Sequence, residues 1–151
     1  MLVQMKIRGL MFDPLNHAYI VILRDENNSE ILPIWVGKAE ANAISLAIEG
    51  VLPSRPLTHD LLKNILDALK ASVISSVITD LKDNTYFAKI HLSYNSSEYT
   101  VDARPSDAIA LCLRTEAPIF INDEVLKQHS AEELDRWMDN IRPEDFGKYD
   151  A

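Results

Sequence analysis

Short runs of β-branched and aromatic residues dominate the first third of the chain. They predict strands at 3–13, 18–25 and 30–36, and the intervening PLN and ENNS segments are typical of turns. The run at 18–25 is apolar on both of its alternating faces. Because a strand has this pattern when both faces are covered, we expect it in the interior of a sheet.

Two helices are predicted next. Residues 38–50 are good helix formers and end in Gly50, which suits the left-handed residue that closes a helix. Residues 58–70 have the clearest amphipathic pattern of the chain, with apolar residues at helical spacing on one face and polar residues on the other. The apolar positions are Leu61, Leu62, Ile65, Leu66 and Leu69.

The strand pattern returns in the second half. It predicts strands at 72–81, 86–94 and 99–103, followed by a helix at 105–116 and a short apolar strand at 118–122. Each half of the chain therefore reads as a hairpin, a third strand and a helix.

The two halves also share a local sequence. AISLAI begins at Ala43 and AIALCL at Ala108, 65 positions later. Either an internal duplication or a shared helix composition produces such a match. The predicted fold class is α+β, with a mixed, largely antiparallel sheet, packed helices, and an internal duplication of a β-β-β-α unit as an open alternative.

One domain fits a chain of 151 residues, of which 47% are hydrophobic and 25% charged. We assign residues 1–128 to this domain and residues 129–151 to a C-terminal helix and acidic tail. The helix is predicted at 130–141, where a serine followed three residues later by a glutamate forms a capping-box signature. The single cysteine, Cys112, lies in an apolar run and is expected in the core.

The net charge of −8 argues against a nucleic-acid partner, because phosphate binding normally requires a basic surface. Residues 123–151 hold nine acidic and four basic residues and so carry −5, which leaves −3 for residues 1–122. A local basic groove on the main body therefore stays open.

The N-terminal residues lack the cationic start and apolar run of a signal peptide, and no stretch approaches 18 uncharged apolar residues. We expect a soluble, cytoplasmic protein with no membrane contact.

Two polar clusters lie where helices are predicted to begin. In RPLTHDLL, Thr58 is placed as an N-cap, and the charge of Asp60 in the first turn favours the helix dipole. Capping does not explain Arg55 or His59, which would face solvent and any anion at this helix start.

The segment DARPSD at 102–107 repeats this arrangement. Arg104 could pair with Asp102 or Asp107, and Ser106 or Asp107 could cap the helix. Each cluster has two interpretations: a capped turn, or one corner of an active site.

Other polar residues have simpler explanations. Glu40 is in the first turn of a helix, and Asp83 is in a hairpin turn. Trp35 and Trp137 are expected in the core or at an interface. The zinc-protease, paired-cysteine, Walker A, serine-hydrolase and dinucleotide motifs are absent from the sequence.

Four motifs in order resemble the bifunctional nuclease domain family over about residues 5–127. They read LPIWVGKAEANAISLAIEG, RPLTHDLLKNIL, VITDLKDNTYFAKI and VDARPSDAIALCLRTEAPIFI. The resemblance implies a nuclease that acts on RNA and DNA. The family's polar positions fall on Glu40, Arg55, His59, Asp60, Asp80, Asp83, Asp102, Arg104, Ser106 and Asp107.

Phosphodiester cleavage requires an activated water and stabilisation of the charge that develops on the phosphate. Carboxylates contribute by holding Mg²⁺ or Mn²⁺. We expect Asp60, Asp102 and Asp107 as catalytic residues that also hold the metal, and His59 as the general base. The residues expected to bind the substrate are Arg55, Arg104 and Ser106.

The opposing hypothesis is a non-catalytic binding or assembly domain. In it, the two polar clusters are salt-bridged turns, and the apolar helices form the interface of a homo-oligomer. A homo-oligomer is expected under either hypothesis.

Overall fold

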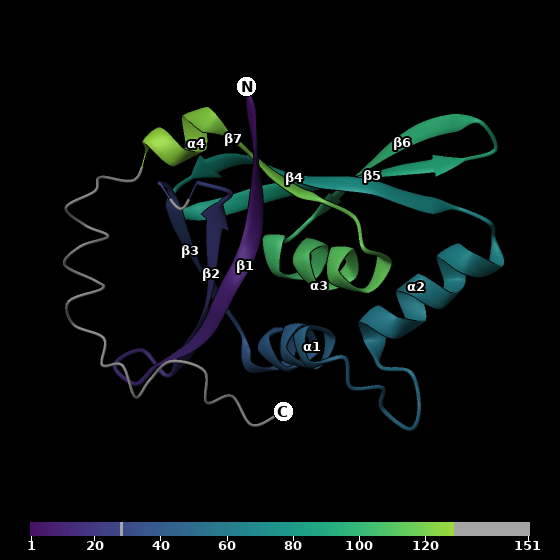
Figure 1. The fold of residues 1–151 in the computed structure, drawn as a ribbon, viewed down its shortest axis with the longest axis horizontal. Helices are drawn as coiled ribbons and strands as arrows, with labels where there is room; N and C mark the ends of the chain where they lie inside the picture. Colours follow the sequence, from purple (N-terminus) through teal and green to yellow (C-terminus); the bar gives the residue numbers. More distant parts are fainter. Residues whose placement is uncertain (28, 129–151) are drawn as a thin grey trace.

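Seven strands form one mixed sheet within residues 1–27 and 29–128, the part of the chain that the computed structural model describes (Figure 1). The strands are β1 (Leu2–Asp13), β2 (Ala18–Asp25), β3 (Ile31–Val36), β4 (Ser72–Lys82), β5 (Thr85–Tyr94), β6 (Ser97–Ala103) and β7 (Ile119–Asn122). The helices are α1 (Lys38–Glu49), α2 (Thr58–Ala68), α3 (Pro105–Thr115) and α4 (Asp123–Lys127).

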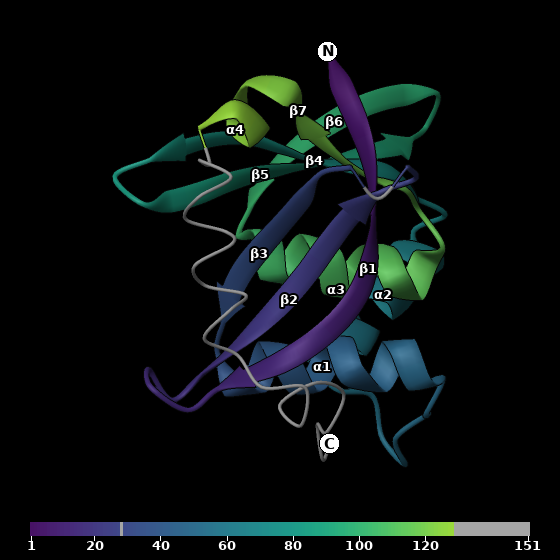
Figure 2. The ribbon, with the colours of Figure 1, turned by 60° about the vertical axis from the view of Figure 1, so that its left-hand side comes forward.

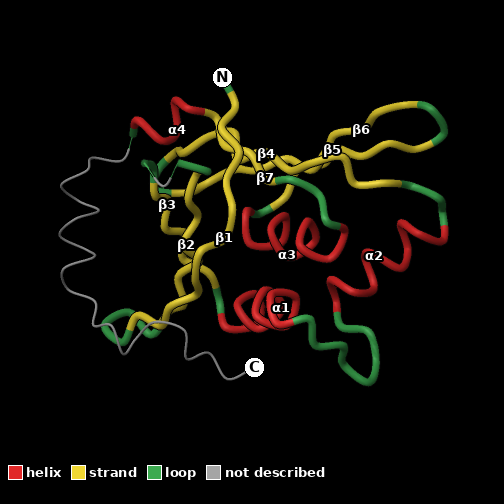
Figure 3. Tube along the Cα trace, viewed as in Figure 1, coloured by secondary structure: helices red, strands yellow, loops and turns green. Residues whose placement is uncertain are grey.

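The strand order β3-β2-β1-β7-β4-β5-β6 places two three-stranded meanders on either side of β7. The pairing of β4 with β7 is parallel, and the other pairings are antiparallel. The predicted α+β class with a mixed, largely antiparallel sheet is therefore confirmed. Each meander is followed by a helix, α1 or α3, and Figure 3 shows this β-β-β-α unit in both halves.

The core lies between the sheet and the two helices α1 and α3. Figure 2 shows both helices against the same side of the sheet. Strand β2 lies between β1 and β3, and its residues 20–23 are all buried, as predicted for an interior strand. Most of α3 is also buried, including Cys112, which packs in the core.

Two helix starts differ from the prediction. The N-cap of α2 is Leu57 and not Thr58, and the Asp60 side chain accepts a hydrogen bond from the Leu57 backbone N–H. The N-cap of α3 is Arg104, with Pro105 as the first helical residue, so neither Ser106 nor Asp107 caps this helix. In both helices the acidic residue lies inside the first turn, where it favours the helix dipole.

The end of α1 matches the prediction. Gly50 has a φ of 68°, the left-handed conformation that glycine adopts without steric cost. The short helix α4 was not predicted. The predicted helix at 130–141 and the acidic tail lie outside the described residues. No helix within the described residues is long and apolar enough to cross a membrane.

Helix α2 is amphipathic, as its sequence pattern predicts, but its apolar face is turned outward. Its one fully buried residue is His59. Leu66 packs against the core, whereas Leu61, Ile65 and Leu69 are exposed. The helix contacts the rest of the fold mainly through its first turn and one side of α3.

Candidate functional site

Three helix starts meet at one polar cluster. Glu40 is in the first turn of α1, His59 in the first turn of α2, and Asp107 in the first turn of α3, with Arg104 as the N-cap of α3. We call these four residues the helix-start cluster. Positive helix ends attract negative charge, and this cluster places two carboxylates at such ends.

The hydrogen bonds of the helix-start cluster form a continuous chain. His59 Nε2 lies 2.9 Å from Asp107 Oδ1. Arg104 donates from Nε to Asp107 Oδ2 at 2.8 Å and from Nη2 to Glu40 Oε1 at 2.7 Å. The His59 side chain is only 10% exposed, whereas that of Arg104 is 64% exposed. A buried imidazole is therefore joined to a solvent-facing guanidinium through one carboxylate.

The protonation states follow from these contacts. Burial raises the pKa of Asp107, but the hydrogen bonds from Arg104 and His59 outweigh it and hold the pKa below its ordinary value. The hydrogen bonds that Arg104 donates to Asp107 and Glu40 raise the pKa of Arg104. At neutral pH, Asp107 is therefore ionised and Arg104 is charged.

Gly37 leaves room for the carboxylate of Glu40. A Cβ atom placed on Gly37 would lie 2.5 Å from Glu40 Oε2, so only glycine fits beside this carboxylate in its present position. The other carboxylate oxygen of Glu40 accepts the bond from Arg104. Gly37 therefore allows the Glu40 carboxylate to take the position in which it accepts the hydrogen bond from Arg104.

A second ion pair joins α2 to α3. Arg114 Nε donates to Asp60 Oδ1 at 2.7 Å, and its Nη1 and Nη2 donate to the backbone oxygens of Ala110 and Ala43. Burial raises the pKa of Asp60, but the hydrogen bonds from Arg114 and the Leu57 backbone lower it below the ordinary value. One arginine thus ties α1, α2 and α3 together.

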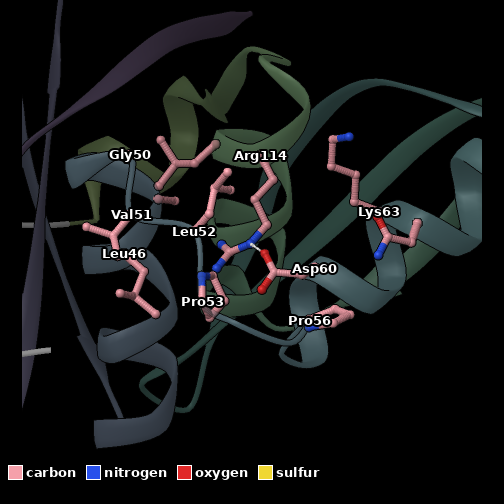
Figure 4. A pocket seen from close by; sticks show the side chains of 12 residues that line it. Leu46, Gly50, Val51, Leu52, Pro53, Pro56, Asp60, Lys63 and Arg114 are labelled. Carbon is pink, nitrogen blue, oxygen red and sulfur yellow. Dashed lines mark hydrogen bonds and ion pairs between the residues drawn. The ribbon is translucent and has the colours of Figure 1, made fainter.

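The Asp60–Arg114 pair lies in the largely apolar pocket of Figure 4, whose walls include Leu52, Pro53 and Pro56. Its volume is about 430 Å³. Arg114 is not among the site residues predicted from the sequence. The sequence did contain a signal for it. Asp107 and Arg114 are seven residues apart and so lie on one face of α3. Their partners, His59 and Asp60, are adjacent on α2.

Arg104 and Ser106 also line a hollow of about 280 Å³ beside β3. Trp35 and Tyr86 line the same hollow, from β3 and from the start of β5. Trp35 is 44% exposed and does not belong to the core. This hollow combines a guanidinium with two aromatic residues.

The other predicted site residues are separate from the helix-start cluster. Asp102 lies on β6 opposite Lys89, and strand alternation points its side chain away from the face on which Ile90 and Val101 lie. Arg55 is exposed in the loop before α2. Asp80 lies on β4, and Asp83 lies in the β4–β5 turn next to Asn84 and Thr85, which line the hollow that contains Arg104.

The three carboxylates expected to hold a metal do not form one donor set. Asp60 is bonded to Arg114, Asp107 to Arg104 and His59, and Asp102 faces elsewhere. Within the described residues, no group of three or more His, Cys, Asp or Glu side chains is placed to hold a metal ion. This arrangement does not fit the expected Mg²⁺ or Mn²⁺ site.

Comparison with known proteins gives consistent matches. The sequence model named Bifunctional nuclease domain matches residues 21–133. An uncharacterized protein of Mycobacterium tuberculosis is 32% identical over 162 residues, covering 95% of this chain and 97% of that protein. Bifunctional nuclease 1 of Arabidopsis thaliana is 31% identical over 117 residues, covering 76% of this chain but 36% of the plant protein. Bifunctional nuclease 2 of the same plant is 29% identical, covering 70% of this chain and 33% of its own length.

Proposed function

Because the chain belongs to the Bifunctional nuclease domain family, we propose that it hydrolyses phosphodiester bonds of RNA or DNA at the helix-start cluster. The observation that carries this proposal is the 2.9 Å contact between His59 Nε2 and Asp107 Oδ1, next to Arg104. Segments far apart in the sequence meet there, and helix capping accounts for none of these side-chain contacts.

In this proposal His59 is the general base. Its Nε2–H donates to Asp107, so Nδ1 is the nitrogen that accepts a proton from the attacking water or from a ribose 2′-hydroxyl. Asp107 holds the ring in this tautomer and balances the positive charge of the imidazolium that forms. General base catalysis of this kind contributes about 10²- to 10⁴-fold to a rate.

Arg104 is the phosphate-binding residue of the proposal. Its side chain is mostly exposed, and a planar guanidinium contacts two phosphate oxygens at once. Trp35 and Tyr86, in the same hollow, offer surfaces on which a base of a single strand stacks.

The charges of the cluster favour an added cation. Two carboxylates, Glu40 and Asp107, face one guanidinium. A polyanionic substrate would therefore gain from a further positive charge, which a divalent cation supplies. We assign no ligands to Mg²⁺ or Mn²⁺ and no catalytic step to either ion; a dependence of activity on these ions stays a prediction.

A non-catalytic binding or assembly role is the second candidate function. The exposed apolar residues of α2 favour it, because a surface helix usually buries such residues. It explains the ion pairs as contacts that fix α2 to α3.

The test is cleavage of labelled single-stranded RNA and DNA by the purified protein, with Mg²⁺, with Mn²⁺ and with EDTA. Asp107→Asn and Asp102→Asn, purified identically, are the matched variants. We expect cleavage that the Asp107 change abolishes and the Asp102 change leaves largely intact. Equal cleavage by all three proteins would assign the activity to another site or to a contaminant, and no cleavage under any condition would favour the assembly role.

A further inference from the structure

The apolar face of α2 is the largest feature of the fold that the nuclease proposal leaves unexplained. We define the α2 stripe as Leu57, Leu61, Leu62, Ile65 and Leu69. Leu61 is 51% exposed, Ile65 46% and Leu69 56%. These residues follow one another at helical spacing, so they form one continuous surface and not scattered exposed side chains.

Polar contacts, and not the stripe, hold α2 on its own chain. The first turn is fixed by the His59–Asp107 and Asp60–Arg114 bonds. An amphipathic helix in a monomer normally turns its apolar face to the core and its polar face to water. Here only Leu66 packs against the core, and two specific pairs in the first turn fix the helix with the rest of its apolar face outward.

A second apolar surface lies on the β5–β6 hairpin. We define the β6 patch as Tyr94, Tyr99 and Val101, each of which is exposed. The strand register places them on one face of the hairpin, where Tyr94 and Tyr99 also contact each other. Figures 1 and 2 place this hairpin and α2 at the same end of the molecule.

We propose that a second copy of this chain covers the α2 stripe. In a two-fold arrangement, the stripe of each copy packs on the β6 patch of the other, so that one symmetric contact covers both surfaces. Covering these side chains removes on the order of 700 Å² per copy from water, close to the roughly 800 Å² per partner of a stable interface. This inference does not rest on nuclease activity.

Two other occupants fit less well. Residues 129–151 continue from α4, which lies at the opposite end of the fold from α2 (Figure 1). An anionic membrane surface requires basic residues beside the apolar face, whereas this chain carries a net charge of −8 and Lys63, the basic residue of α2, is paired with Asp67.

The test is sedimentation equilibrium of the full chain over a wide range of protein concentration. The variant is Leu61→Gln/Ile65→Gln, and the control is Leu15→Gln, a more exposed leucine in the β1–β2 turn. We expect a dimer for the unmodified protein and the control. The affinity of the double variant for itself should be at least about a hundredfold lower, because four apolar side chains per dimer are no longer buried. Circular dichroism of the variant should be unchanged, because the replaced residues are exposed in the single chain.

A monomer at all concentrations would overturn the inference, as would a dimer that the double variant does not weaken. Labelling of an Ile65→Cys variant with a thiol reagent separates the remaining cases, because Cys112 is buried. Protection of position 65 that grows with protein concentration supports the second copy. Constant protection in a protein that sediments as a monomer would show that another part of the same chain covers the stripe and would refute the proposal.

Discussion

His59 Nε2 lies 2.9 Å from Asp107 Oδ1, and this contact joins the first turn of α2 to the first turn of α3 across 48 positions of the sequence. The same contact has two consequences. It orients the imidazole whose Nδ1 we propose as the base, and it docks a helix whose leucines point outward. Helix docking and the proposed chemistry therefore depend on one carboxylate.

Replacing Gly37 with alanine should lower activity with little loss of stability. The new Cβ would meet Glu40 Oε2 at 2.5 Å, so the carboxylate must shift, which we expect to weaken the hydrogen bond that it accepts from Arg104. We expect a rise in KM for the oligonucleotide and a fall in kcat/KM of about tenfold, since one charge-assisted bond is worth about 1.5 kcal/mol or more.

Gly9→Ala is the control for this change, because nothing lies within 4 Å of the Cβ position there. Steady-state kinetics and urea unfolding of both variants make the comparison. A Gly37→Ala protein with unchanged kcat/KM would show that the Arg104–Glu40 contact has no part in activity.

Arg114→Met should destabilise the protein. The change keeps much of the side-chain volume but leaves the partly buried Asp60 without its charged partner and two backbone oxygens without their donors. Breaking a buried ion pair in this way should lower the free energy of unfolding by about 2–4 kcal/mol. The cost is smaller than for a fully buried pair because the Asp60 side chain is partly exposed to solvent.

Urea unfolding at neutral pH measures this cost. Arg114→Met/Asp60→Asn removes the uncompensated charge and should recover part of the lost stability. If the Arg114→Met protein had the same free energy of unfolding as the unmodified protein, this would contradict the role given to Arg114.

Stability should fall at acid pH. The pKa values of Asp60 and Asp107 are lowered by their hydrogen-bond partners below the ordinary carboxyl value of 3.8. A group whose pKa is lower in the folded state stabilises the protein fully above the unfolded value and loses that contribution as the pH falls through the folded value. The free energy of unfolding should therefore be flat near neutrality and decrease below about pH 4.

Asp60→Asn should weaken this acid dependence without removing it. The pKa values of Asp13 and Asp25 are also lowered by hydrogen bonds that outweigh their burial, so these residues continue to titrate. Urea unfolding at a series of pH values tests this. An identical acid slope in the variant would mean that Asp60 has the same pKa in the folded and unfolded chains.

Trp35→Ala should weaken binding of single-stranded oligonucleotides about tenfold, because base stacking on an aromatic ring contributes about 1–3 kcal/mol. Burial raises the pKa of Asp13, and hydrogen bonds, one of them from the Trp35 side chain, outweigh it. Trp35→Phe keeps an aromatic ring but loses this bond, so it separates stacking from the contact with Asp13. Fluorescence anisotropy of a labelled strand should show near-normal affinity for Trp35→Phe, and equal losses in both variants would refute stacking.

The elements of the fold were predictable where the local pattern determines the environment. Strand β2 is apolar on both faces because both faces are covered, and Gly50 ends α1 because only glycine adopts its φ freely. The direction of the apolar face of α2 was not predictable. Helical periodicity shows that one face is apolar, whereas long-range pairs decide which way that face points.

The candidate site was predictable in part, and long-range contacts explain the rest. The segments around His59 and Asp107 do meet, but Asp102 and Asp107 separate although they belong to one six-residue segment. Strand alternation turns Asp102 to the other face, and the chain then turns into α3. Arg114 was missed because a sequence pattern does not show its partners. Asp60 lies in a distant segment, and the other two partners are backbone oxygens.

The most direct test of the account is the cleavage rate of the His59→Gln protein on a labelled single strand. His91→Gln is the matched control, because His91 lies on β5 away from the helix-start cluster. We predict that His59→Gln lowers kcat by about 10²- to 10⁴-fold, as expected for loss of a general base, in a protein that still folds because the glutamine amide can donate the hydrogen bond to Asp107. A His59→Gln protein that cleaves the strand as fast as His91→Gln would contradict the central claim.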